Sequence, residues 1–283
     1  MPINFAFIRD VGPLRWAMRT AIRQYYKRIA KRDHQMKLPT GEWMTLPIGD
    51  HFASEAFITK GDVDWGSESL LFSLLDQRGV FLDVGAHIGY YSLYMLPRVV
   101  KAYCFEPDPR VFDLLENNVS GKPQIETIPW AVGATKGRAR FTLERDSEIS
   151  HLSRYGEDKF RQIVVDIVTI DTFVFERGLA VEAIKIDVEG HDIEVIRGAM
   201  GVLEEQQPLV LTEAKADAEL FALMQGISYR VHAYVRLPRT REKLMTELSA
   251  DVPIAGETKM LFLVPHRLKR RFSQAVKSLL PVP

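Results

Sequence analysis

The chain has 283 residues, of which 46% are hydrophobic and 26% are charged, with 37 basic and 37 acidic residues. This composition is ordinary for a globular protein and excludes a disordered or low-complexity chain. A single cysteine, Cys104, excludes an internal disulfide framework, and no apolar run approaches the roughly 18 residues that a membrane span needs. We therefore expect a soluble cytoplasmic protein.

The charged residues are unevenly distributed along the chain. Residues 1–38 contain nine lysine and arginine residues against two aspartates, and residues 266–283 contain five against no acid. The acidic body between these ends argues against nucleic-acid binding, because a phosphate backbone needs a basic groove at the site itself. We expect a basic amphipathic helical extension over 1–38, one α/β domain over 39–265 and a basic tail over 266–283.

The first predicted element is a helix over 13–32. Its apolar residues recur at three- and four-residue spacing, and its basic residues form a stripe with a four-residue repeat: Arg15, Arg19, Arg23, Lys27 and Lys31. Two interpretations stay open, a solvated face on a helix packed against its own domain, or a surface helix that binds anionic lipid or an acidic partner. Residues 39–66 are predicted to be irregular with one short strand near 51–62, and a helix follows from Ser67.

From residue 80 onward, apolar strands alternate with amphipathic helices. Strands are predicted over 80–85, 102–107, 125–132, 183–189 and 208–214, and helices over 90–96, 109–119, 191–204 and 216–225. This alternation is typical of a doubly wound parallel sheet with helices on both faces. Alternating polar and apolar residues between 133 and 182 predict an antiparallel β insertion. Residues 229–236 and 260–265 predict a closing antiparallel pair joined by a polar loop.

The segment FLDVGAHIGYYS (81–92) places a glycine turn after the first of these strands. Ligands in open α/β sheets bind at the carboxyl ends of the strands, and Gly85 and Gly89 let the backbone turn sharply there. Glu106 ends the next strand, where an acid can accept both hydroxyls of a ribose, and Asp83 is placed to neutralise an ammonium group. The turn lacks the middle glycine of the dinucleotide fingerprint. S-adenosylmethionine is therefore favoured, while NAD, in an NAD-dependent oxidoreductase, stays open.

Five later segments, together with this turn, resemble the FkbM family of S-adenosylmethionine-dependent methyltransferases: FEPDP (105–109), WAVG (130–133), VVDIVTIDTFV (164–174), IKIDVEGHDIEVIRGA (184–199) and PLVLTEA (208–214). The resemblance implies the class I methyltransferase fold, a Rossmann-like, doubly wound, mostly parallel seven-stranded sheet with an antiparallel last strand. It also implies O-methylation of a hydroxyl on a sugar, glycolipid or other secondary-metabolite acceptor. The implied cofactor-binding residues are Asp83, Gly85, Ala86, His87, Gly89, Glu106, Pro107, Trp130, Ala131 and Asp187, with His87 standing where the family commonly has asparagine.

A hydroxyl is a poor nucleophile, so methyl transfer to it needs a base or a metal that removes its proton. The predicted catalytic residues follow the fourth core strand: either His191 or Asp187 as the base, with Glu189 beside them. The alternative for His191 and Glu189 is support of the helix that begins near Gly190. A divalent cation held by Asp187, Glu189 and Glu213 is chemically allowed, although no spacing demands one.

The expected acceptor is a small molecule or a lipid-linked sugar. The basic ends suit peripheral association with an anionic membrane at its inner face. A noncatalytic binding module that uses these ends stays open as a further alternative to an enzyme.

Overall fold

The computed structural model describes residues 5–143, 151–152, 161–238, 240 and 242–279. The chain begins with α1 (Phe5–Val11) and α2 (Pro13–Gln24), which continues as a π-helical segment, η1 (Tyr25–Ala30). An antiparallel hairpin of β1 (His34–Lys37) and β2 (Trp43–Leu46) follows, then α3 (Phe52–Thr59) and α4 (Ser67–Leu74). The helix predicted over 13–32 is confirmed.

The strand predicted near 51–62 is wrong, because this segment forms helix α3. Ala53, Ala56 and Phe57 recur at helical spacing and are all buried. The hairpin before it was not predicted: β1 lies at the end of the predicted helical extension and β2 in the segment predicted to be irregular, and neither short strand contains a continuous apolar run.

The main sheet has eight strands in the order β13-β12-β14-β11-β10-β3-β4-β5. They are β3 (Val80–Val84), β4 (Lys101–Phe105), β5 (Ile125–Ile128), β10 (Val181–Ile186), β11 (Leu209–Thr212), β12 (Tyr229–Arg236), β13 (Lys243–Leu248) and β14 (Leu261–Pro265). Strands β5, β4, β3, β10 and β11 run parallel, and β14 runs antiparallel to β11 and β12. This is the doubly wound α/β sheet of a class I methyltransferase with its reversed last strand.

The sheet has one strand more than the seven expected, because β13 pairs with β12 at the edge. Residues 237–259 were predicted to be a polar loop. Within β13 only Leu248 is buried, so the segment lacks the apolar pattern by which a strand is found in a sequence.

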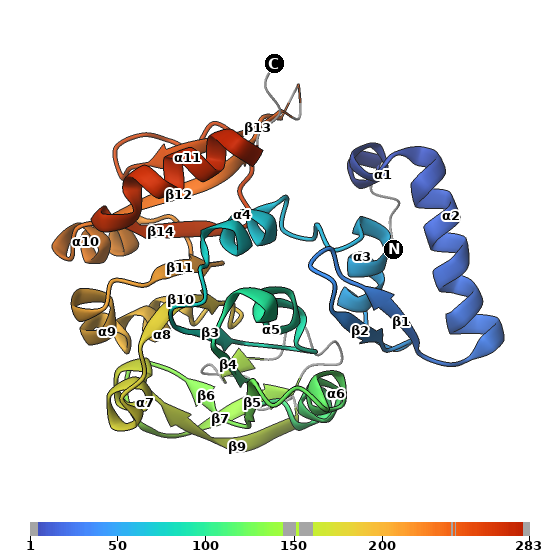
Figure 1. The fold of residues 1–283 in the computed structure, drawn as a ribbon, viewed down its shortest axis with the longest axis horizontal. Helices are drawn as coiled ribbons and strands as arrows, with labels where there is room; N and C mark the ends of the chain where they lie inside the picture. The colour runs from blue at the N-terminus through green and yellow to red at the C-terminus, as the bar shows by residue number, and fades with distance from the viewer. Residues whose placement is uncertain (1–4, 144–150, 153–160, 239, 241, 280–283) are drawn as a thin grey trace.

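Helices cover both faces of the sheet (Figure 1). One face packs against α4, α5 (Tyr90–Met95), α6 (Pro109–Val119) and α11 (Lys269–Leu279), and the other against α7 (Ile170–Arg177), α8 (Asp192–Arg197), α9 (Met200–Glu205) and α10 (Ala218–Gly226). Short 3-10 turns, η2 (Leu96–Arg98) and η4 (His266–Leu268), follow α5 and β14. The sequence pattern did not predict α7, and the helix predicted over 191–204 is two helices.

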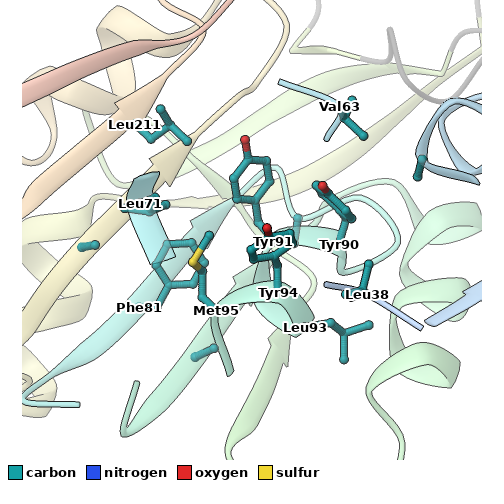
Figure 2. Close-up of a cluster of buried hydrophobic side chains, with 14 of the residues drawn as sticks. Leu38, Val63, Leu71, Phe81, Tyr90, Tyr91, Leu93, Tyr94, Met95 and Leu211 are labelled. Carbon is teal, nitrogen blue, oxygen red and sulfur yellow. The ribbon is translucent and has the colours of Figure 1, made fainter. Parts of the chain in front are cut away.

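Alternate residues of β3 supply the two cores, because successive side chains of a strand point to opposite faces. Phe81 packs with α5 on one face, where Figure 2 shows the rings of Tyr90, Tyr91 and Tyr94 gathered beside it. Leu82 points to the other face, in the core that α7 to α10 cover. Burial on both faces explains why the central strands are continuous apolar runs.

The predicted insertion forms a separate four-stranded sheet in the order β6-β9-β7-β8. Its strands are β6 (Ala131–Val132), β7 (Gly137–Leu143), β8 (His151–Leu152) and β9 (Arg161–Val168). Strand β7 pairs antiparallel with β8 and β9, as expected, and β6 pairs parallel with β9. The strand predicted over 125–132 is thus divided between the two sheets. Most of the connecting loop predicted near 146–159 lies outside the described residues.

The carboxyl ends of the central strands are aligned by backbone hydrogen bonds. The Gly85 amide donates to the Phe105 carbonyl at 3.0 Å, and the Asp187 amide donates to the Val84 carbonyl at 3.1 Å. The winding direction of the chain reverses between β3 and β10, which is where open α/β sheets bind their ligands. Among the helices of the described residues, none has both the length and the hydropathy of a transmembrane span.

Candidate active site

A cavity of about 200 Å³ lies at these carboxyl ends. Its walls come from the ends of β3, β4, β10 and β11, from β6 to β8 of the insertion, and from the segment around α3. All but two of the predicted site residues line it: Gly85, Ala86, His87, Glu106, Pro107, Trp130, Ala131, Asp187, Glu189 and His191. The exceptions are Asp83 and Gly89, which hold the turn from outside the cavity.

The glycine turn needs its two glycines for space and for backbone angle. Gly85 has φ +72°, and a Cβ there would lie 1.9 Å from the carbonyl oxygen of Asp187. Gly89 has φ +86°, and its Cβ would lie 2.9 Å from Leu115 of α6. Gly85 thus lets β3 and β10 end side by side, and Gly89 lets α5 begin against α6. His87, between them, has φ +49° although it is not glycine.

Glu106 is held rigidly against this turn. One carboxylate oxygen accepts a hydrogen bond from the His87 amide and the other accepts one from the Asp108 amide, both at 2.9 Å. Burial raises the pKa of Glu106 to about 7, even though these two bonds favour its charged form. The carboxylate therefore lines the cavity in a fixed orientation and has lone pairs left for a ligand that donates hydrogen bonds.

A buried lysine that the sequence analysis did not single out neutralises two of the predicted acids. The ammonium of Lys185 lies 3.8 Å from Asp83 and 3.5 Å from Asp187, and it donates to the Gly85 carbonyl at 2.6 Å. Asp83 also accepts hydrogen bonds from the amide and hydroxyl of Ser92. The ammonium group that Asp83 faces is thus that of Lys185, and Asp83 anchors α5 to β3.

Burial by itself lowers the pKa of Lys185, but Asp187 and Asp83 outweigh it, so the lysine stays charged. The charge of Lys185 in turn lowers the pKa of Asp187. Burial by itself raises the pKa of that carboxyl, but Lys185 and other contacts bring it below its usual value. Lys185 occupies the second position of the IKIDVEG motif, so the motif contained it, although nothing in the local pattern indicates that its side chain points between two carboxylates.

Three carboxylates meet at the ends of β10 and β11. Oxygens of Asp187, Glu189 and Glu213 lie within 4.8 Å of one another. Burial and the charge of Asp187 raise the pKa of Glu213 to about 9 and that of Glu189 to about 7. Near neutral pH the group therefore contains an ionised Asp187, a protonated Glu213 and a half-ionised Glu189. Oxygen ligands of this kind suit Mg²⁺, and the divalent-cation site stays a prediction.

The two histidines of the cavity are both engaged. The Nε2 atom of His191 donates to the Leu152 carbonyl at 3.0 Å, so the neutral ring carries its lone pair on Nδ1. His191 is also the residue that precedes α8, and it gives that helix no side-chain cap. The Nε2 atom of His87 lies 3.3 Å from Asp50, which caps α3. His87 therefore joins the glycine turn to the N-terminal part of the chain.

The outer wall comes from a segment in which the sequence analysis identified no site residue. Asp64 accepts from the hydroxyl of Tyr91 at 2.5 Å and lies 3.1 Å from the ammonium of Lys259, and all three residues line the cavity. Behind them Glu68 is fully buried and accepts from the hydroxyl of Tyr90 at 2.9 Å. The available signal was an acid in a short helical segment beside three leucines, since acids packed among apolar residues are rare without a partner or a role.

Comparison with known proteins places these features in one family. The sequence profile of the Methyltransferase FkbM domain matches residues 83–234, more than half of the chain. The chain is 27% identical over 137 residues to the hexuronic acid methyltransferase AglP of Haloferax volcanii, covering 48% of this chain and 56% of that protein. It is 29% identical over 170 residues to the 2-O-methyltransferase NoeI of Sinorhizobium fredii, covering 53% of this chain and 69% of NoeI.

Among solved structures, the methyltransferase FkbM of Methylobacillus flagellatus has 17% identity and a TM-score of 0.42, over 74% of this chain and 52% of that one. The chain thus spans little more than half the length of AglP and of this structure. The matched residues contain the glycine turn, Glu106 and the three carboxylates at the ends of β10 and β11. The chain is a member of the FkbM methyltransferase family.

Proposed function

We propose that this protein transfers a methyl group from S-adenosylmethionine to a hydroxyl of a sugar. The observation that carries the proposal is the buried Glu106 carboxylate, fixed by two backbone amides beside a glycine turn at the switch point of the sheet. A ribose presents two neighbouring hydroxyls, which donate to the two oxygens of one carboxylate. Family membership supports the same donor.

The remaining walls suit the other parts of this donor. Trp130 and Ala131, at the start of the insertion, line the side where the adenine would lie beyond the ribose. Gly85 and His87 line the side of the amino-acid tail. Asp83 lies outside the cavity, where Ser92 and Lys185 hold it, whereas Asp187 lines the cavity, so we assign Asp187 to the cationic end of the donor. NAD is disfavoured, because the GAHIG turn lacks the fingerprint that holds a pyrophosphate.

The carboxylates at the ends of β10 and β11 supply the proton chemistry. The acceptor oxygen attacks the methyl carbon, the carbon–sulfur bond breaks, and S-adenosylhomocysteine leaves with the bonding electron pair. The hydroxyl proton passes to Glu189, whose pKa of about 7 suits a base that works near neutral pH. Asp187 is a weaker base because Lys185 holds its pKa down, and His191 remains the second candidate through Nδ1.

Sugar acceptors are proposed because both curated relatives are methyltransferases of related sequence, and the name of AglP specifies a hexuronic acid. The test has two stages. Calorimetry with S-adenosylmethionine, S-adenosylhomocysteine and NAD should give binding heat with the first two alone. Purified protein should then transfer labelled methyl groups to oligosaccharides that contain hexuronic acid, and Glu189→Gln should reduce this transfer while S-adenosylhomocysteine still binds.

Binding of NAD without S-adenosylmethionine would refute the donor assignment. Label transfer to a protein or nucleic acid, with none to any saccharide, would refute the acceptor class. Repeating the transfer with a chelator and with added Mg²⁺ tests whether Asp187, Glu189 and Glu213 work with a cation.

A further inference from the structure

The N-terminal helix is attached to the protein by its basic face. Arg23 is almost completely buried, and its guanidinium donates to the carbonyls of Leu46 and Pro47 and to the hydroxyl of Ser54. Arg19 donates to the Ile58 carbonyl at 2.5 Å. Much of the basic stripe predicted to be a solvated or lipid-binding face therefore lies against α3 and the hairpin.

The apolar face of the same helix consequently points away from the protein. The exposed fractions are 83% for Leu14, 56% for Met18, 41% for Ile22, 51% for Tyr25 and 72% for Ile29. These residues follow one another at three- and four-residue spacing, so they form one continuous stripe over α2 and η1. Single exposed apolar residues are ordinary, but a contiguous stripe of five large ones indicates a surface that something else covers.

The charges around this stripe select its partner. No acid occurs between residues 11 and 32. The acids that flank this span are engaged, because Asp10 pairs with Arg236 at 2.9 Å and Asp33 accepts from the Ile48 amide at 2.8 Å. Exposed basic residues border the stripe: Arg15, Arg28, Lys31 and Arg32. A second copy of the chain would bring these basic borders together, whereas an anionic lipid surface complements them.

The position of α2 leaves room for a flat surface. In Figure 1 the helix lies along the right margin of the molecule, and the basic C-terminal helix α11 lies apart from it at the upper left. The two basic ends therefore do not form one face. Helix α3, on which α2 packs, also supplies Phe52 and Glu55 to the cavity wall.

We propose that the exposed stripe of α2 and η1 is a membrane-binding face that inserts into the interfacial region of a membrane rich in anionic lipid. The side chains of the stripe enter the boundary between headgroups and acyl chains, and the bordering arginines and lysines contact lipid phosphates. This docking would hold the cavity near the membrane surface, where a lipid-linked acceptor is found. The docking itself does not depend on the methyl donor or on the reaction.

The test is co-sedimentation with vesicles of phosphatidylglycerol and phosphatidylcholine in equal parts, against vesicles of phosphatidylcholine alone. The wild-type chain should bind the anionic vesicles, and Leu14→Gln/Met18→Gln/Ile22→Gln should weaken this binding by about 100-fold or more. The matched control, Val164→Gln/Phe175→Gln/Val252→Gln, removes three exposed apolar side chains from other faces and should bind as the wild type does. Arg28→Gln/Arg32→Gln should weaken binding by about 25-fold, at about fivefold for each charge.

Each readout distinguishes docking from folding and from the proposed reaction. All substituted side chains are exposed, so thermal unfolding and affinity for S-adenosylhomocysteine should match the wild type. Equal vesicle binding by the Leu14/Met18/Ile22 variant and the wild type would overturn the proposal, as would failure of the wild type to bind anionic vesicles. A wild-type dimer that this variant loses, with no vesicle binding by either, would assign the stripe to a second copy instead.

Discussion

Replacing Glu106 by glutamine should weaken the binding of S-adenosylhomocysteine by roughly 100-fold near pH 8, because the substitution conflicts with two fixed donors. Both carboxylate oxygens accept a backbone amide at 2.9 Å, from His87 and from Asp108. A glutamine has one oxygen, so its NH₂ group must face one of these N–H groups. The charge that receives the ribose hydroxyls is lost as well.

The magnitude follows from the bonds that change. Hydrogen bonds to a charged group contribute about 1.5–3 kcal/mol each, and the two ribose hydroxyls together lose roughly 3 kcal/mol when the acceptor becomes a neutral, misaligned amide. Isothermal titration calorimetry measures the change directly. The matched control is Glu126→Gln on the neighbouring strand. Glu126 does not line the cavity, and its carboxylate lies 2.6 Å from the ammonium of Lys101. This variant should bind S-adenosylhomocysteine as tightly as the wild type does.

A pH series gives the same prediction a second readout. The pKa of Glu106 is raised to about 7 by burial, so in the ligand-free protein this carboxylate takes up a proton as the pH falls through 7. If the ligand needs the carboxylate, wild-type affinity drops by about tenfold between pH 8 and pH 6. Glu106→Gln should lack this part of the dependence. Unchanged affinity of the variant, or parallel pH profiles of variant and wild type, would refute the reasoning.

Three further predictions concern stability. Gly85→Ala should destabilise the fold by at least about 3 kcal/mol in urea unfolding, because φ is +72° and its Cβ would lie 1.9 Å from the Asp187 carbonyl; a loss below about 1 kcal/mol would contradict it. Lys185→Met should cost about 3–5 kcal/mol, since the fully buried Asp83 and the partly exposed Asp187 lose their counter-ion, whereas Lys101→Met, at a half-exposed pair, should cost under about 1 kcal/mol. Burial and a neighbouring acid raise the pKa of Glu68 to about 8, so the folded protein holds the proton of this carboxyl more tightly than the unfolded chain does. The free energy of unfolding therefore falls as the pH rises from about 4.5 to 8. Glu68→Gln should therefore melt about 5 °C above the wild type near pH 9 but equal it near pH 5, by calorimetry.

Much of the fold follows from local patterns in the sequence. The continuous apolar runs over 80–85 and 183–189 predict central strands because both faces of a parallel sheet are buried. The glycine turn between β3 and α5 is equally local, since Gly85 and Gly89 have positive φ. Most of the predicted site residues line one cavity for the same reason, because the carboxyl ends of parallel strands meet at one edge.

What the sequence did not predict depends on contacts between distant segments. Strand β13 has no apolar pattern, and it forms because its backbone pairs with β12 at the edge of the sheet. Residues 51–62 contain the spacing of a helix, but their aromatic and β-branched residues equally fit a strand, and packing against α2 and the hairpin decides between the two.

The sequence by itself determined which residues of this chain can turn, which can form a sheet, and which acids end the strands, because these properties depend on neighbours in the chain. Only the tertiary structure decided which charges meet. It places Lys185 between Asp83 and Asp187, which come from different strands, and it turns the basic stripe of α2 inward through Arg23 so that the apolar stripe faces out. The energy of a charge depends on the distance and burial of its partners, and these are properties of the folded chain.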